Sequence, residues 1–500
     1  MLARVRSAAV IGIEAFPVTI EVDVSYGLPG FTVVGLPDAI VRESRDRIRS
    51  AIRNSGYEFP KHRITVNLAP ADMRKAGASY DLPIALAVLA TCGPVQRRDV
   101  VEVLIVGELS LDGAIQTARG VLPIAIAARR QRIPGLLLPA ANGPEAAVVE
   151  GLELFPVGSL VEAVAALNVP IPVTLAAQPP GAAPENIHGD FADVRGQALA
   201  KRALEIAAAG GHNVLLSGPP GSGKTMMAKR AAGILPSLTF DESLEVTAIH
   251  SVAGLLEGAA GLVRARPFRA PHHTISDVAL VGGGPNPRPG EISLAHNGVL
   301  FLDEMPEFSR HVLEVLRQPL EDGMVRISRA QRTATFPARF VLIGAMNPCP
   351  CGFLGDPRRP CRCTPGQIDR YAARLSGPLR DRIDLTVTVA ALPTGDLMGE
   401  TAEEATAAIR ARVERARRLQ AVRGEETRAT VNARLAGRAL RRVCALDART
   451  MELLHGAVER LGLSARAFDR ILRVARTIAD LWESDRVQFD HVAEALQFRS

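Results

Sequence analysis

A glycine-rich segment directly after a short apolar run constrains the fold of this chain more than any other feature. The run at 213–217 leads into eight residues with the spacing G-x-x-x-x-G-K-T, and a helical pattern follows: Gly218, Pro219, Pro220, Gly221, Ser222, Gly223, Lys224 and Thr225. Glycines let backbone N–H groups turn toward phosphate oxygens, and the helix N-terminus adds its positive dipole end. We therefore expect a strand, a phosphate-binding loop and a helix. Lys224 would reach the β- and γ-phosphates of a nucleotide, and the Thr225 hydroxyl would hold Mg²⁺.

Two later apolar runs end in polar side chains that suit the same site. The run 299–302 is followed by Asp303 and Glu304, and the run that begins at Phe340 ends at Asn347. We expect Asp303 to hold the Mg²⁺ shell and Glu304 to polarise the attacking water. Asn347 would orient that water from the other side, or else it only caps a turn. The order of phosphate loop, acidic pair and polar strand end is that of an AAA+ ATPase.

The length of 500 residues predicts several domains, and the pattern of apolar, glycine and proline residues changes along the chain. Residues 1–170 mix strand-like and helical runs; the clearest helix is 38–54, with an apolar stripe of Ile40, Val41, Ile48 and Ile52. A proline-rich stretch reads as a linker. The next 200 residues alternate strands, helices and glycine-rich loops, which predicts a parallel α/β sheet. The remainder is helical in pattern. The fold class we expect is α/β multidomain with a helical C-terminal region.

Composition narrows the range of functions. The net charge of +6 is an ambiguous sign of nucleic-acid binding, because only five of the 59 basic residues are lysines and an arginine bias also follows genome composition. With 4% aromatic residues and one Trp, base stacking is a poor candidate for the main mode of such binding. No apolar run approaches the ~20 residues of a membrane span. We expect a soluble cytoplasmic protein without a membrane partner.

Four of the six cysteines form a C-x-C-x₉-C-x-C cluster directly after Asn347, at Cys349, Cys351, Cys361 and Cys363. Four thiolates meet the tetrahedral requirement of Zn²⁺, and a Gly/Pro-rich spacer allows the chain to fold back. We predict a structural zinc site; the alternatives are reduced structural cysteines or a redox pair. Cys92 and Cys444 lie in apolar surroundings and are expected to be small core residues.

Longer motifs resemble one family over essentially the whole chain. The segments 266–276, 282–298 and 302–308 resemble the ComM/YifB family of magnesium-chelatase-like AAA+ proteins. The resemblance implies ATP and Mg²⁺ as cofactors and a homo-oligomeric ring, usually a hexamer, with an active site between subunits. In the first of these segments, His272 and His273 fit a loop at the subunit or DNA face better than a metal site.

The same resemblance implies a domain layout. Residues 1–170 would form a Lon-protease-like α+β domain (ribosomal-S5-domain-2-like, ChlI-type), and 171–190 would be a linker. Residues 191–392 would form the AAA+ core with a presensor hairpin and the cysteine cluster. Residues 393–500 would form a C-terminal helical lid of the magnesium-chelatase type.

Particular arginines match motifs of the family. Arg382 is our choice for the finger that completes a neighbour's site, with Arg380 second; the alternative is a surface arginine before an ordinary strand. Arg466 resembles the sensor-2 arginine, which contacts the γ-phosphate. These roles are implied by the resemblance and not by the spacing of the arginines.

Residues 324–335 alternate in character after a Glu-Asp-Gly turn signal, which predicts a β-hairpin. Related ring ATPases point such a hairpin into the central channel. Arg326, Arg329 and Arg332 would then contact DNA phosphates, with a strength that falls with salt. The alternative is a solvated hairpin with ordinary surface charges.

The resemblance implies helicase and branch-migration activity on single-stranded or branched DNA, promoting the integration of transforming DNA. One alternative is an ATP-dependent Lon-like protease with Ser79 as nucleophile. Leu122, however, stands where the lysine base would be required, and no lysine lies between Lys75 and Lys201. We therefore expect the N-terminal domain to lack peptidase activity. The other alternative is a motor subunit that helps insert Mg²⁺ into a porphyrin.

Overall fold

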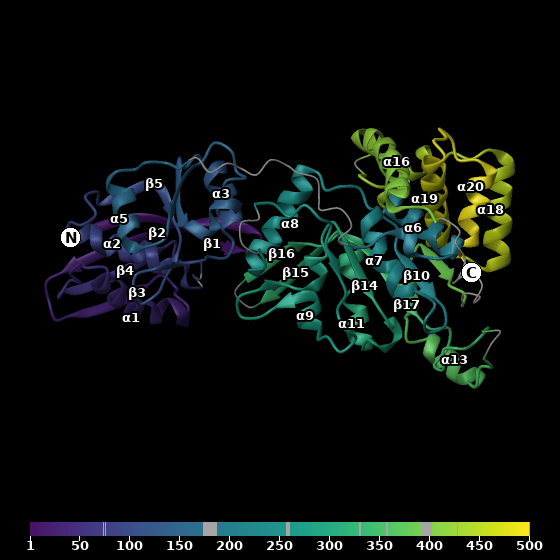
Figure 1. Ribbon diagram of the computed structural model, residues 1–500, viewed down its shortest axis with the longest axis horizontal. Helices are drawn as coiled ribbons and strands as arrows, with labels where there is room; N and C mark the ends of the chain where they lie inside the picture. The colour runs from purple at the N-terminus through teal and green to yellow at the C-terminus, as the bar shows by residue number, and fades with distance from the viewer. Residues whose placement is uncertain are drawn as a thin grey trace.

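The computed structural model describes residues 1–73, 75, 77–173, 188–256, 261–329, 332–356, 359–391, 403–427 and 429–499. The molecule is elongated, with an N-terminal sheet at one end, a parallel sheet in the middle and helices at the other end (Figure 1). Most of the linker expected at 171–190 lies outside the described residues. Among the helices described, none combines the length and apolar character needed to cross a membrane.

The N-terminal sheet has seven strands in the order β3-β4-β2-β1-β5-β8-β9. Antiparallel pairing joins β1 to β2 and β2 to β4, whereas β3–β4, β1–β5, β5–β8 and β8–β9 are parallel. The strands are β1 (Leu2–Ile11), β2 (Glu14–Ser25), β3 (Gly30–Val34), β4 (Arg63–Ala69), β5 (Asp99–Ile105), β8 (Gly135–Pro139) and β9 (Glu153–Val157). The accompanying helices are α1 (Ala39–Asn54), α2 (Asp81–Cys92), α3 (Val121–Arg130), α4 (Gly143–Ala146) and α5 (Leu160–Asn168).

The helix predicted at 38–54 is confirmed as α1. Asp38 caps it by accepting a hydrogen bond from the backbone N–H of Val41 at 2.8 Å. Val41, Ile48 and Ile52 are buried as the apolar stripe predicts, but Ile40 is 43% exposed, so that part of the stripe was wrong. Ile40 is the second residue of the helix, next to Val41, and consecutive helical residues do not share a face.

The central sheet is wholly parallel, as the sequence predicts, in the order β11-β14-β17-β10-β18. Its strands are β11 (Phe268–Arg269), β14 (Val299–Leu302), β17 (Val341–Met346), β10 (Val214–Ser217) and β18 (Leu385–Thr388). The short helices near it are α9 (Asp277–Val281), α10 (Glu291–Leu294), α11 (Arg310–Glu314), α12 (Arg317–Asp322), α13 (Pro365–Ala372) and α14 (Gly377–Arg380). Because β17 lies between β10 and β14, the ends of all three strands meet at one edge.

The hairpin predicted at 324–335 is confirmed as β15 (Met324–Arg329) paired with β16 (Arg332–Pro337), in a register that places Arg326 opposite Thr335. One face is buried by Val325, Ile327, Ala334 and Phe336. The β1–β2 turn of the N-terminal sheet lies against this hairpin: a Cβ on Gly12 would come within 2.6 Å of the Thr335 carbonyl oxygen. Gly12 also has a φ of +64°, a left-handed conformation that favours glycine.

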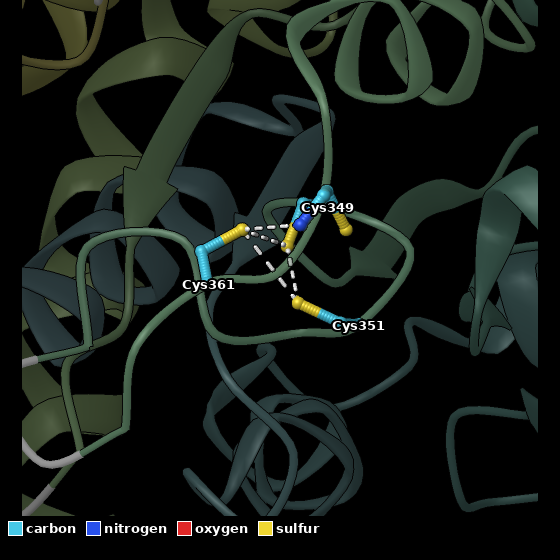
Figure 2. Close-up of side chains that lie close together, drawn as sticks. Cys349, Cys351 and Cys361 are labelled. Atoms are coloured by element: carbon cyan, nitrogen blue, oxygen red, sulfur yellow. Dashed lines mark hydrogen bonds between the residues drawn. The ribbon is translucent and has the colours of Figure 1, made fainter.

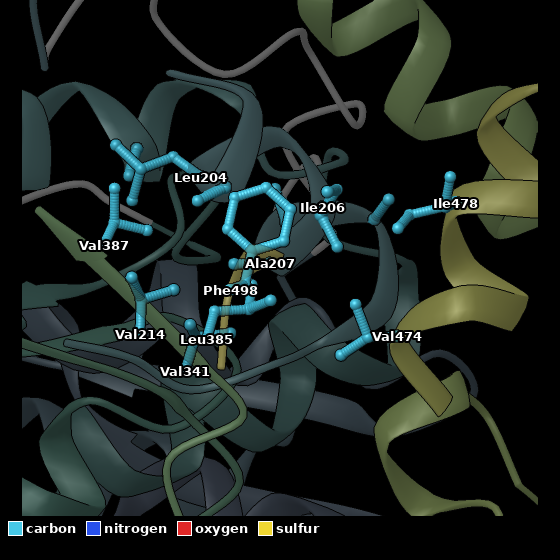
Figure 3. Packing of buried hydrophobic residues seen from close by; sticks show 14 of the residues in the cluster. Leu204, Ile206, Ala207, Val214, Val341, Leu385, Val387, Val474, Ile478 and Phe498 are labelled. Atoms are coloured by element: carbon cyan, nitrogen blue, oxygen red, sulfur yellow. The ribbon is translucent and has the colours of Figure 1, made fainter. Parts of the chain in front are cut away.

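The C-terminal helices share one hydrophobic core with the central sheet (Figure 3). They are α16 (Thr406–Thr427), α17 (Gly437–Val443), α18 (Ala448–Leu461), α19 (Ala465–Leu481) and α20 (Phe489–Gln497), and no strand occurs in the described part of this region. Figure 3 shows Val474 and Ile478 of α19 facing Ile206 of α6 (Ala198–Gly210), which in turn lies over the sheet. The predicted helical character of this region is confirmed, and Cys444 is buried as expected. Cys92 is exposed, contrary to expectation, because it is the last residue of α2.

Candidate functional site

The phosphate loop connects β10 to α7 (Lys224–Ile234). Gly218 passes close to the strand end of β18: a Cβ there would lie 2.2 Å from the Val389 carbonyl oxygen, so no larger residue fits. Gly223 has a φ of +87°, a left-handed conformation directly before the helix starts. The two glycines thus explain why the chain can turn from strand to helix in this space, with helix N–H groups opening toward the loop.

Lys224 is buried beside this loop. Its ammonium donates hydrogen bonds to the carbonyl oxygens of Gly218 at 2.7 Å and Pro219 at 2.8 Å, and to Oδ1 of Asn347 at 3.4 Å. Burial lowers the pKa of Lys224, while the nearby charges of the acidic pair raise it. The Ser222 hydroxyl is buried without a hydrogen-bond partner in the described structure. A buried cation and an unpartnered hydroxyl in a glycine-rich loop fit a phosphate ligand.

The acidic pair at the end of β14 lies next to the start of α7. The Thr225 hydroxyl donates to Oδ2 of Asp303 at 2.6 Å, which brings together the two groups expected to hold Mg²⁺. The Glu304 backbone N–H donates to Oδ1 of Asp303 at 3.0 Å. The side chain of Glu304 is 58% exposed, so its carboxylate is open to solvent, and its backbone φ of +49° is left-handed. These oxygens are of the type that Mg²⁺ takes from proteins.

A histidine that the sequence analysis did not connect with this site lies beside Glu304. Nδ1 of His273 is 3.9 Å from Oε2 of Glu304, and the His273 ring lies 4.1 Å from that of His272. The strand β11 ends at Arg269, so the loop after it carries both histidines to the edge where the acidic pair lies. The paired histidines were visible in the sequence, but only the parallel alignment of β11 with β14 places one of them at Glu304.

A cleft of about 940 Å³ lies at the opposite edge of the same sheet. The residues at or just before the amino ends of four strands line it: Asn213, Gly298, Val341 and Asp384. Arg382 and Arg466 line it as well. The strands β10, β14, β17 and β18 have 4–6 residues. With a rise of about 3.3 Å per residue, the two edges are about 13–20 Å apart. The fold thus brings the two arginines together but separates them from the phosphate loop of their own chain.

The three predicted arginines differ in their surroundings. Nη1 of Arg382 donates to the Pro378 carbonyl oxygen at 2.5 Å, Nη2 forms an ion pair with Glu321, and Nε is buried without a partner in the described structure. Arg380, our second choice, is exposed and donates to the carbonyl oxygen of Ala372 at 2.6 Å. Arg466 is also exposed. Within the part of the chain that the structure describes, Arg382 therefore keeps one donor without an acceptor.

Arg470, which the sequence did not single out, holds the segment that carries Arg382. Its side chain is 5% exposed and donates to the carbonyl oxygens of Arg380 at 3.2 Å and Ile383 at 2.8 Å, and it pairs with Asp381 at 3.1 Å. These contacts fix both sides of Arg382. The only signal in the sequence was its spacing of one helical turn after Arg466, in a helix with several other arginines.

The four clustered cysteines are brought together, as predicted. Sγ of Cys349 lies 3.4 Å from that of Cys351, and both lie 3.6 Å from that of Cys361 (Figure 2). The sulfur of Cys363 joins them, and all four ligand atoms lie within 4.8 Å of one another. Backbone N–H groups of Arg362 and Phe353 lower the pKa of Cys351 to about 6. All four are free cysteines, and the arrangement suits a metal ion.

The hairpin arginines can be followed only in part. Arg326 is exposed on the face of β15 opposite to the buried Val325 and Ile327. The side chains of Arg329 and Arg332 lie outside the described residues, so their predicted contacts remain predictions. Residues 330–331 at the tip are likewise not described.

The fold and the site together define a class. A parallel α/β sheet carries a phosphate loop, an acidic pair and a polar strand end at one edge, and a helical C-terminal region packs against it. These features are those of P-loop ATPases of the AAA+ type.

Comparison with known proteins places the chain within that class. Family profiles described as "Magnesium chelatase, subunit ChlI", "Subunit ChlI of Mg-chelatase" and "Magnesium chelatase, subunit ChlI C-terminal" match residues 190–397, 20–142 and 403–499. The chain is 45% identical to YifB of Escherichia coli and to the competence protein ComM of Haemophilus influenzae, in each case over all of this chain and 97% of the relative. It belongs to the ComM/YifB family of magnesium-chelatase-like proteins.

A more distant relative is the magnesium-chelatase 38 kDa subunit of Cereibacter sphaeroides. It is 26% identical over 177 residues, which are 32% of this chain and 52% of that subunit. The likeness to the competence protein thus extends over the whole chain, whereas the likeness to this chelatase subunit extends over a third of it.

Proposed function

We propose that this protein is an ATP-hydrolysing ring motor acting on DNA, a ComM-like helicase and branch-migration factor that promotes the integration of transforming DNA. One observation carries the motor: the phosphate loop with its acidic pair lies at one edge of the central sheet, and Arg382 lies in a cleft at the other. A single chain cannot bring both to one nucleotide. Copies stacked edge to edge can, and closure of such a head-to-tail contact gives a ring, which we propose is a hexamer.

The site residues have distinct roles in this proposal. The loop Gly218–Thr225 binds the phosphates of ATP, and Lys224 turns from the loop carbonyls to the β- and γ-phosphates. Thr225 and Asp303 hold Mg²⁺, which neutralises charge on the phosphates. Glu304 accepts a proton from the attacking water, and Asn347 orients that water. ATP and Mg²⁺ are the cofactors of the motor, with a structural Zn²⁺ at the four cysteines.

The arginines act between subunits in this proposal. Arg382 of one subunit stabilises charge on the phosphoryl group bound to the next, and its unpartnered Nε supports that role. Arg466 lines the same cleft, so it contacts the γ-phosphate of that same neighbour's nucleotide. A site completed in this way hydrolyses ATP only when subunits are assembled.

The hairpin β15–β16 is the proposed DNA contact. Its buried face anchors it to the core of the motor, and Arg326 projects from the other face. With Arg329 and Arg332, it would contact DNA phosphates in the central channel. The full-length likeness to a relative named a competence protein supports a role in transformation.

The domain division we propose remains 1–170, 171–190, 191–392 and 393–500, with the first unit Lon-like and without peptidase activity. Ser79 lies half-buried in a short 3₁₀ helix, Ala78–Tyr80. Leu122, at the position where Lon proteases have their lysine base, is fully buried in α3. A hydroxyl without a base is a weak nucleophile, which argues against the protease alternative.

A chelatase-type motor subunit is the second candidate, favoured by the family descriptions and by the Cereibacter relative. Both candidates hydrolyse ATP, so the response of the protein to DNA discriminates between them. The experiment measures ATP hydrolysis and strand separation by the purified chain with and without forked DNA. We expect DNA to stimulate hydrolysis and Lys224→Ala to abolish it. Lys229→Ala, on the exposed side of the same helix, is the matched control and keeps activity. The DNA motor is excluded if the protein hydrolyses ATP but forked DNA neither stimulates that hydrolysis nor is unwound.

A further inference from the structure

The spacing of the sulfurs matches a tetrahedral metal site rather than a pair of disulfides. A disulfide needs about 2.05 Å between sulfurs. Four sulfurs at about 2.3 Å from a central Zn²⁺ lie about 3.8 Å from one another. The observed separations among Cys349, Cys351 and Cys361 are 3.4–3.6 Å, and the fourth thiol completes a set within 4.8 Å. The Cys363 backbone N–H also donates to the sulfur of Cys361 at 3.4 Å, a contact of the kind that supports the ligands of a metal site.

The segment that carries two of these thiols is packed against the phosphate loop. Gly352 has a φ of +84°, and a Cβ there would lie 2.7 Å from Cδ of Pro220 in the loop and 3.9 Å from Cγ of Asn347. The Gly352 backbone N–H donates to the Cys349 carbonyl oxygen at 2.9 Å. The residue directly after the second cysteine is therefore packed against Pro220 of the phosphate loop.

A second link runs through Asn347, which stands two residues before Cys349. Its side-chain oxygen accepts a hydrogen bond from the Lys224 ammonium. Cys349 is fully buried. Any change in how the thiols hold residues 347–352 must therefore move either Pro220 or the partner of Lys224. Close-packed contacts of this kind transmit displacements instead of absorbing them.

We propose that a Zn²⁺ ion bound by the four thiolates holds the turn at Gly352 against Pro220, so that the affinity of the phosphate loop for nucleotide depends on metal occupancy. The metal takes no part in hydrolysis and acts through the position of the loop. This inference deepens the proposed function, because it rests on residues 218–225 being the ATP site.

The experiment compares metal content with nucleotide binding in the full chain. Zinc is measured by mass spectrometry after purification, and the dissociation constant of a fluorescent ATP analogue is measured by titration. We expect one zinc per chain in the unaltered protein. The double variant Cys361→Ser/Cys363→Ser should lose the zinc, and its dissociation constant for the analogue should rise about tenfold or more. Cys92→Ser, at an exposed cysteine outside the cluster, should change neither value.

A second variant separates the metal from the contact and does not depend on folding of the cysteine variant. Gly352→Ala removes none of the four thiols; it adds a methyl group toward Pro220 and strains the backbone at a φ of +84°. We expect zinc to be retained and nucleotide binding to weaken. The site assignment is overturned if the unaltered protein carries no zinc. The coupling is overturned if Gly352→Ala, or the zinc-free protein, binds the analogue as tightly as the unaltered chain. If DNA fails to stimulate hydrolysis, the proposal of a DNA motor is refuted, but the coupling between zinc and nucleotide binding is not.

Discussion

Replacement of Arg470 by methionine tests how the cleft arginine is held in place. The substitution keeps the aliphatic stem and removes the guanidinium, whose donors reach the carbonyl oxygens of Arg380 and Ile383. The contact with Ile383 is buried and that with Arg380 is partly buried. An unsatisfied buried carbonyl costs about 1–3 kcal/mol. The ion pair with Asp381, which is 41% exposed, adds less than about 1 kcal/mol. We therefore expect a loss of about 1–4 kcal/mol in the free energy of unfolding.

The chain provides its own probe for this measurement. Trp482 is the only tryptophan and directly follows α19, the helix that contains Arg470. Guanidinium unfolding followed by Trp482 fluorescence reports the stability of this region. Arg460→Ala is the matched control, since Arg460 is exposed in the neighbouring helix α18 and its side chain donates to one backbone carbonyl. Exposed substitutions of this type change stability by less than about 0.5 kcal/mol.

The same variant has a functional readout that a purely structural role would not produce. Arg470 does not line the phosphate loop, so nucleotide affinity should be unchanged, while the rate of hydrolysis at saturation falls because Arg382 loses its fixed backbone. A misplacement of about 1 Å can cost about 100-fold in rate. Our reasoning is refuted if Arg470→Met and Arg460→Ala unfold within about 0.5 kcal/mol of each other and hydrolyse ATP equally fast.

Four further predictions follow from single contacts. His273→Ala should lower the maximal rate of ATP hydrolysis about tenfold without changing nucleotide affinity, because Glu304 loses its neighbour at 3.9 Å; an unchanged rate contradicts this. Arg326→Ala should weaken DNA binding and reduce the salt dependence by about one phosphate contact, measured by titration at several salt concentrations. Phe336→Ala should destabilise the hairpin core by about 3–5 kcal/mol in thermal unfolding, since Phe336 is fully buried. Burial, opposed by Arg47, raises the pKa of Asp81 to about 6, so folding takes up a proton and the free energy of unfolding falls by about 2 kcal/mol as pH rises from about 4 to 6. Asp81→Asn should remove this dependence of the free energy of unfolding on pH, which circular dichroism measures across the same pH range.

Much of the site was predictable because its parts are short and local. The phosphate loop is a continuous segment whose glycines are required by backbone geometry, and Thr225 and Asp303 meet at 2.6 Å as the strand order implies. The alternation of residues 324–329 predicts a hairpin because side chains of a strand point to opposite faces in turn. Cysteines only two residues apart must lie close together wherever the chain goes. Each of these segments is short, and only the contact between Thr225 and Asp303 joins positions that are 78 residues apart.

Roles that depend on distant partners were not predictable in this way. His273 reaches Glu304 only because β11 and β14 are parallel neighbours. From the sequence alone, the expected place of His273 was a loop at the subunit or DNA face. The exposure of Cys92 follows from where α2 ends, which an apolar sequence run does not specify.

Sequence alone established the strand–loop–helix unit, the acidic pair, the hairpin and the cysteine cluster, since the periodicity and spacing that define them are contained within each segment. The sequence could not tell which arginines hold the cleft together, because many arginines share the same charge and a similar spacing along a helix. Tertiary structure decided that Arg470 holds residues 380–383, about 90 positions away, and that Arg382 faces a cleft at the amino ends of the strands. The physical reason is packing: α19 shares a core with the central sheet, and only that contact determines which buried donor meets which carbonyl.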